Sequence, residues 1–150
     1  CCVGVLAGFG LPAGLSDPIA AVAAGAGAIG CRAPPDSPLN TIREPAHPVS
    51  VIIIHGLKDY GAPYNGGRGY HSYFFLSIND SVMFWVRHDG CSDKAQMEVD
   101  SSGGTIRYAY GGGNNGTEVV LYVLINGEHS WPVPFATDEA WKFFESHPKV

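Results

Sequence analysis

The sequence predicts a single α/β domain, residues 1–150, whose sheet is mostly parallel and flanked by helices. Four consecutive β-branched residues, Val51 to Ile54, are typical of a strand that is buried on both faces. Strand segments and helical segments alternate along the chain, as layered α/β folds require. The chain has 150 residues, of which 45% are hydrophobic and 15% charged, and this composition suits one domain with a substantial core.

Charge and hydropathy argue against two classes of partner. The net charge is −5, and the nine Lys and Arg residues form no cluster, which argues against a nucleic-acid-binding surface. Residues 3–30 are apolar, but Pro12, Asp17 and Pro18 interrupt them, so we expect no transmembrane helix there and no membrane partner. The segment also lacks the basic start of a signal peptide. A chain that opens inside apolar sequence is expected to be a processed product or a piece of a longer protein.

The first third of the chain contributes two predicted strands. Residues 1–18 fit either a short strand or part of a helix. Residues 19–24 form a short apolar strand candidate that ends at a glycine. Residues 30–48 contain five prolines and therefore predict a loop. The central strand follows and runs to about residue 55.

Residues 78–89 predict a helix with recognisable ends. Apolar residues recur there at helical spacing, Ser77 is a suitable N-cap, and Asp80 suits the first turn. Gly90 is placed to end the helix.

The last third of the chain predicts two strands and a final helix. Residues 105–110 alternate as a strand, residues 111–117 carry a turn signal, and residues 118–125 form the next strand, so residues 105–110 are expected to be a hairpin strand. Residues 126–132 break this strand sharply. Thr137 is the expected cap of a final helix, with acidic residues in its first turn.

Asp59 and His129 each follow a buried strand directly. The carboxyl ends of neighbouring parallel strands meet at one edge of a sheet, so the two side chains are expected to come together. A carboxylate bonded to one imidazole nitrogen fixes the tautomer and leaves the other nitrogen free to act as a base. Two simpler interpretations stay open: Asp59 as a turn former in a Gly/Pro loop, and His129 as a packed or solvent-facing ring beside Trp131.

Two strings around these residues resemble one family. Residues 48–67 read PVSVIIIHGLKDYGAPYNGG and residues 118–132 read EVVLYVLINGEHSWP. The first resembles the acid loop of the polyhydroxybutyrate depolymerase and feruloyl esterase group of α/β hydrolases, and the second resembles the segment that carries its catalytic histidine. Further similar segments are Asp17–Val22, Trp85 with Gly90-Cys91, and Trp141–Phe144. The resemblance covers roughly residues 16–148 and implies the carboxyl-terminal half of an α/β-hydrolase sheet.

The resemblance implies a secreted carboxylic-ester hydrolase that needs no metal or organic cofactor. Asp59 and His129 would be two members of a Ser-His-Asp triad, in the chain order that this fold uses. The implied substrate is a polyhydroxyalkanoate or a feruloylated or acetylated plant polysaccharide. Tyr64, Trp131 and Phe135 could line an apolar entrance, or simply belong to the core and rim.

The sequence departs from the family pattern in two places, the motif that carries the nucleophile and the position of a second cysteine. The sequence contains no G-x-S-x-G string, and the nearest is Gly14-Leu15-Ser16-Asp17-Pro18. Ser16 is therefore either a candidate nucleophile or the loop residue before the strand at 19–24. Gly111 to Gly113 stand where family members often carry a second cysteine, so Cys31 or a terminal cysteine remains open as the partner of Cys91.

Three hypotheses follow. The first is an ester hydrolase whose nucleophile and oxyanion hole lie upstream of the matched region. The second is a non-catalytic binding or assembly module built on the same half fold, whose exposed strand edge would pair with a second copy or a complementing chain. The third is a metal site formed by His47, His55, Asp59 and His129. The spacing of these four residues along the chain matches no known ligand motif.

Overall fold

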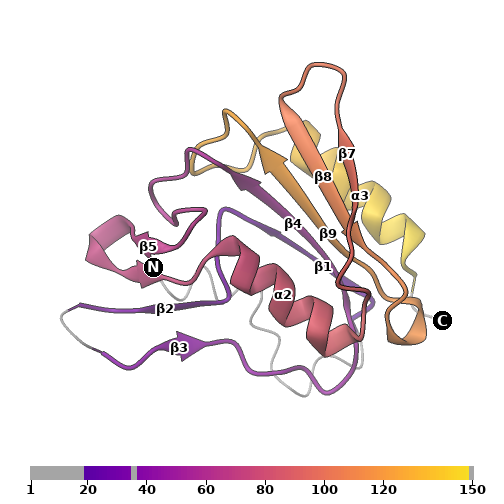
Figure 1. Ribbon diagram of the computed structural model, residues 1–150, viewed down its shortest axis with the longest axis horizontal. Helices are drawn as coiled ribbons and strands as arrows, with labels where there is room; N and C mark the ends of the chain where they lie inside the picture. Colours follow the sequence, from indigo (N-terminus) through magenta and orange to yellow (C-terminus); the bar gives the residue numbers. More distant parts are fainter. Residues whose placement is uncertain (1–18, 35–36, 149–150) are drawn as a thin grey trace.

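The computed structural model describes residues 19–34 and 37–148 and shows a mixed α/β fold. A five-stranded sheet has the spatial order β1-β4-β9-β8-β7, with α2 and α3 beside it (Figure 1). These elements are β1 (Ala21–Gly25), β4 (Ser50–Gly56), α2 (Ile78–Asp89), β7 (Gln96–Val99), β8 (Thr105–Tyr110), β9 (Val119–Leu124) and α3 (Phe135–Ser146).

The sheet is mixed, so the expectation of a mostly parallel sheet was wrong. β4 runs parallel to β1 and to β9, whereas β8 runs antiparallel to both β9 and β7. The connections explain the difference. Only residues 111–118 join β8 to β9, and only residues 100–104 join β7 to β8. Such short links make hairpins, because a parallel crossover needs a dozen or more residues.

β4 lies at the centre of the core, as its apolar run predicts. All seven of its residues are buried. Val51 and Ile53 belong to a hydrophobic cluster with Trp85 of α2, and Ile52 and Ile54 belong to a second cluster with residues of α3. Side chains of a strand alternate between faces, so the two clusters lie on opposite faces of the sheet. The two helices therefore cover different faces.

The predicted ends of α2 are confirmed. The backbone N–H of Asp80 donates to the hydroxyl oxygen of Ser77 at 3.0 Å, and the Asp80 carboxylate accepts from the Ser77 backbone at 3.2 Å. This reciprocal pair satisfies two N–H groups that the first turn leaves without partners. Gly90 ends the helix in the left-handed conformation at φ 70°, where a residue without Cβ is favoured.

The predicted cap of α3 was wrong. The helix begins at Phe135, two residues before Thr137, and its N-cap is Pro134, which already has helical dihedrals of φ −80° and ψ −16°. Thr137 lies in the first turn. Its hydroxyl oxygen accepts a hydrogen bond from the Trp131 indole nitrogen at 3.1 Å, so it ties α3 to the preceding loop instead.

A small second sheet takes two of its four strands from the region that the prolines had marked as loop, and the other two from the segment between β4 and α2. Its spatial order is β3-β2-β6-β5 and all its pairings are antiparallel. Its strands are two or three residues long, which is why no period is readable in the sequence. They are β2 (Gly30–Arg32), β3 (Asn40–Thr41), β5 (Gly67–Arg68) and β6 (Phe74–Phe75), with short 3₁₀ turns at Tyr70–Ser72 and Asn114–Gly116. Across the described ranges, no helix has both the length and the hydropathy to cross a bilayer.

The cysteine pairing is settled in part. Cys91, just beyond α2, carries a free thiol whose sulfur lies 3.7 Å from the carbonyl oxygen of Thr117. Cys31 is disulfide-bonded. A Cys31–Cys91 bridge, one of the alternatives left open by the sequence, is therefore excluded.

Candidate active site

The loops after β4 and β9 are joined closely at one edge of the sheet. The backbone N–H of Leu57 donates to the Leu124 carbonyl, and that of Lys58 donates to the Gly127 carbonyl, both at 2.9 Å. A Cβ atom added to Gly56 would lie 2.2 Å from the carbonyl oxygen of Gly127. A glycine at this position is therefore what lets the two loops approach each other.

Asp59 and His129 meet at this edge. Nδ1 of His129 lies 3.0 Å from each oxygen of the Asp59 carboxylate. The Asp59 side chain is fully buried, whereas that of His129 is 31% exposed. Nδ1–H donates to the carboxylate in this arrangement, which leaves Nε2 without a proton and available as a base. The predicted juxtaposition of the two side chains is confirmed.

The backbone of the acid loop fixes the Asp59 carboxylate. Its Oδ1 accepts from the amides of Gly61 and Ala62, each at 2.8 Å. Hydrogen bonds to an ionised oxygen are stronger than those between neutral groups, so the two amides hold the carboxylate firmly in place. Asp59 is thus both a turn residue and a partner of His129, so the two interpretations of its role are compatible.

His55 also belongs to this site, although the sequence analysis considered it only as a metal ligand. Its Nε2 lies 2.9 Å from the carbonyl oxygen of Ala62 and 3.2 Å from Oδ2 of Asp59. Burial lowers the pKa of His55 below its ordinary value, and the Asp59 charge opposes that shift. The only sequence signal was its place at the end of the buried strand, four residues before Asp59.

One tyrosine, Tyr70, lies against His129 and a second, Tyr60, packs on Tyr70; no sequence pattern predicted either contact. The ring of Tyr70 meets that of His129 edge-on, with centroids 5.0 Å apart, and Tyr60 packs edge-on against Tyr70 at 5.4 Å. A Cβ atom on Gly61 would lie 2.5 Å from the Tyr70 ring and 2.7 Å from that of His129. A hydrogen bond with Tyr60 raises the pKa of Tyr70. Tyr70 begins a 3₁₀ turn in which His71 has a φ of 54°. No local sequence pattern predicts this turn, so the contact of Tyr70 with His129 could not be foreseen.

The other candidate residues lie in different places. Tyr64 packs against the cluster under α2, with its ring centroid 6.1 Å from that of His55, whereas the ring of Phe135 packs on Tyr122 at the α3 face of the sheet. Trp131 follows His129 closely in the same loop, is 39% exposed and covers Gly25 at the end of β1. Ser16 lies outside the described residues.

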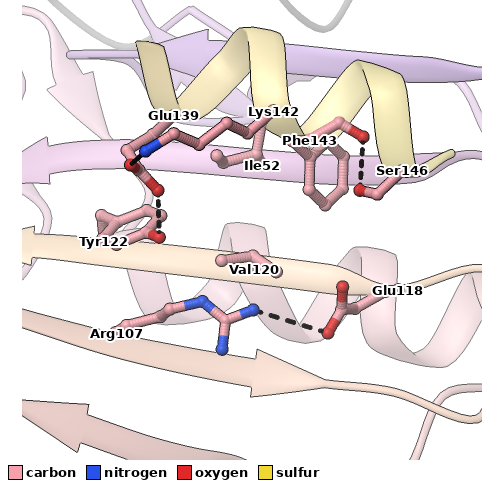
Figure 2. A pocket seen from close by; sticks show the side chains of 9 residues that line it. All are labelled: Ile52, Arg107, Glu118, Val120, Tyr122, Glu139, Lys142, Phe143 and Ser146. Atoms are coloured by element: carbon pink, nitrogen blue, oxygen red, sulfur yellow. Dashed lines mark hydrogen bonds and ion pairs between the residues drawn. The ribbon is translucent and has the colours of Figure 1, made fainter. Parts of the chain in front are cut away.

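A polar cavity of about 280 Å³ lies away from this site, between α3 and the strands β4, β9 and β8 (Figure 2). Glu139 is its central group: it accepts from the Tyr122 hydroxyl at 2.6 Å and from Nζ of Lys142 at 2.7 Å. Burial and the Glu139 carboxylate raise the pKa of Tyr122 to about 12. Neither Asp59 nor His129 lines this cavity. Its polar groups bind one another and tie α3 to the sheet.

The metal hypothesis finds no support in the geometry. Within residues 19–34 and 37–148, no three or more His, Cys, Asp and Glu side chains are arranged to hold a metal ion. His47 precedes β4, whereas Asp59 follows it, so the strand separates two of the four suggested ligands.

Comparison with known proteins adds no assignment. The sequence matches no protein-family model and no curated protein. The geometry of Asp59, His129 and their neighbours is therefore the basis for the functional argument.

Proposed function

We propose that Asp59 and His129 are the acid and base of a carboxylic-ester hydrolase of the α/β-hydrolase type. One observation carries this proposal: a buried carboxylate contacts Nδ1 of an exposed imidazole with both oxygens, at the carboxyl ends of adjacent parallel strands. Active sites of open α/β sheets lie at such strand ends. The order of the two residues along the chain also matches that fold.

The proposed reaction uses His129 first as a base and then as an acid. Nε2 removes the proton of a nucleophilic hydroxyl, whose oxygen attacks the ester carbonyl, and Asp59 stabilises the imidazolium that forms. The imidazolium then gives its proton to the departing alcohol, and water releases the acyl group by the same two steps. Ser16 is the candidate hydroxyl within this chain, and a complementing chain is the alternative source.

The aromatic surroundings of His129 support an ester with apolar or aromatic parts. Tyr60 is 62% exposed, Tyr70 37% and Trp131 39%, so three large rings face solvent near the imidazole or in its loop. Exposed aromatic rings of this kind contact substrates through their faces and edges. The proposed substrates are polyhydroxyalkanoates and feruloylated or acetylated plant polysaccharides, met by a secreted enzyme.

The direct test is hydrolysis of p-nitrophenyl acetate by the purified chain. We expect release of p-nitrophenol above the buffer rate, with a loss of roughly 10³-fold or more in His129→Ala, because the base is removed. His47→Ala is the matched control: it removes an exposed histidine before β4 and reports any background from imidazole alone. A rate equal to that of buffer would contradict Ser16 as the nucleophile and leave a complementing chain as its source, and equal losses in both variants would contradict His129 as the base.

A second candidate function, an assembly module, is favoured by the edge of the sheet at β1. Among the described strands, β1 pairs only with β4. An apolar cavity of about 320 Å³ lies between the start of β1 and Phe144 of α3, and Trp141 of the same helix is 63% exposed. Open strand edges and apolar patches mark association surfaces. We propose that a second copy of the chain covers this edge.

Light scattering coupled to size-exclusion chromatography tests the assembly. We expect the wild-type chain to have twice the monomer mass and Phe144→Glu to shift it to monomer, because a charge would be buried in the interface. Met97→Glu is the matched control at the opposite edge strand, where the residue is 60% exposed. A monomeric wild-type chain would rule out this candidate.

A further inference from the structure

His55 is a buried histidine held in one tautomer. It is 1% exposed, and its Nε2 lies 2.9 Å from the carbonyl oxygen of Ala62. A carbonyl oxygen only accepts, so Nε2 carries the proton and donates it. Nδ1 is also buried, and none of the residues in the described ranges offers it a hydrogen-bond partner. Buried polar atoms without partners are rare and destabilising, so this ring calls for an explanation beyond packing.

The same nitrogen lies beside the Asp59 carboxylate, next to the oxygen that the backbone amides do not contact. Oδ2 of Asp59 lies 3.2 Å from Nε2 of His55, whereas Oδ1 accepts from the amides of Gly61 and Ala62. Nδ1 of His129 then contacts both oxygens. Each oxygen therefore has its own neighbour within the protein, and the carboxylate has little freedom to rotate away from His129.

The charge state of His55 suits this arrangement. Burial lowers its pKa, and the positive charge that His129 carries when protonated lowers it further, although the Asp59 charge acts in the other direction. The ring is therefore neutral at neutral pH. A neutral imidazole presents a partial positive charge to Oδ2 but does not cancel the carboxylate charge. That charge stays available to His129.

We propose that His55 is a positioning residue, which holds the Asp59 carboxylate in the orientation where both oxygens contact Nδ1 of His129. The effect of His55 on catalysis rests on the proposed ester hydrolysis. The effect of His55 on the His129 tautomer does not rest on it, because that tautomer is measurable in the absence of substrate.

Two substitutions separate positioning from packing. His55→Phe keeps a ring of similar volume but removes both nitrogens, whereas His55→Gln keeps a side-chain N–H donor at the place of Nε2. ¹⁵N NMR of the His129 ring then reports which nitrogen is protonated. We expect Nδ1–H alone in the wild type and in His55→Gln, and a mixture of tautomers in His55→Phe. The turnover number of His55→Phe is expected to fall by about 10- to 100-fold, since small misplacements of catalytic groups have such effects, with KM nearly unchanged.

His88 provides a matched control. Its Nδ1 lies 2.8 Å from Oδ1 of Asp89 and its Nε2 lies 3.0 Å from the Pro45 carbonyl oxygen, so at the other end of β4 it has the same kinds of partner as His55, a carboxylate and a carbonyl, although it contacts them through two different nitrogens. His88→Gln is expected to lower the unfolding temperature and leave the spectrum of His129 unchanged.

An unchanged His129 tautomer in His55→Phe would overturn the proposal. If His55→Phe does not fold, His55→Asn takes its place, because its shorter amide has no donor at the position of Nε2, and an Asn spectrum equal to that of Gln overturns the proposal as well. If the tautomer changes as expected while the wild type hydrolyses no ester, the positioning role stands and ester hydrolysis by this chain alone fails.

Discussion

Asp59→Asn is expected to lower the turnover number for an ester substrate roughly 10⁴-fold while the fold is kept. Asparagine has the size of aspartate, and its carbonyl oxygen can still accept from the Gly61 and Ala62 amides. Its NH₂ group would then face His129 and donate to Nδ1. That reverses the tautomer, places the proton on Nε2 and removes the base. Steady-state kinetics with p-nitrophenyl acetate give the loss, and circular dichroism checks the fold.

Asp89→Asn is the control for this prediction. Asp89 is likewise fully buried and bonded to a histidine ring, and it accepts from the Val49 amide at the start of β4, away from the site. Burial raises the pKa of Asp89. This variant is expected to keep its turnover number whatever its stability. Turnover in Asp59→Asn within about tenfold of wild type would show that Asp59 is only a turn residue.

Gly56→Ala is expected to lower the free energy of unfolding by about 3 kcal/mol, at the upper end of the usual range for overpacking. The φ angle of Gly56 is not in the left-handed region, so the loss comes from contact alone. The new Cβ would meet the carbonyl group of Gly127 at 2.2–2.3 Å, and backbone has little freedom to move aside. The unfolding temperature in differential scanning calorimetry is expected to drop by roughly 10 °C.

Gly111→Ala is the matched control, because a Cβ there meets nothing within 4 Å. That variant is expected to be as stable as wild type or slightly more stable, since alanine restricts the unfolded chain. Gly56→Ala should also separate the loops of Asp59 and His129 and abolish the Nδ1–carboxylate contact. Equal unfolding temperatures for the two variants would show that the loops are not packed as the structure has them.

The sequence revealed those parts of the fold that depend on local patterns. The apolar run of β4, the cap of α2 at Ser77 and the alternation of β8 are each encoded within a few residues. β7 was not predicted, because all four of its residues are exposed and an alternation of only four residues, with Met97 and Val99 on one face, is too short to identify a strand. The turn signal at residues 111–117 predicted the hairpin of β8 and β9, which is confirmed. The sheet as a whole was nevertheless expected to be mostly parallel, because β7, which adds a second antiparallel pairing, was not predicted.

The candidate site also has parts that local sequence patterns predict and parts that they do not. Asp59 and His129 were predictable, because each directly follows a strand with a strong pattern and parallel pairing brings the two ends together. The contacts of His55 and Tyr70 depend on where backbone groups and a 3₁₀ turn lie in space. The three suggested entrance residues lie in different places, because aromatic residues near a loop in sequence can pack on either face of the sheet: Phe135 packs on Tyr122, whereas Trp131 is part-exposed in the His129 loop.

The antiparallel hairpin of β7 and β8 pairs with β9, the strand that precedes the His129 loop, and so places β9 inside the sheet. β9 pairs with β4 on one side and with β8 on the other, so its backbone groups are hydrogen-bonded to neighbouring strands. The edge strand on that side of the sheet is β7 instead. Backbone fluctuations decrease from the border of a sheet to its middle. The loop that carries His129 therefore starts from an interior strand, which we expect to be held more firmly than an edge strand would be.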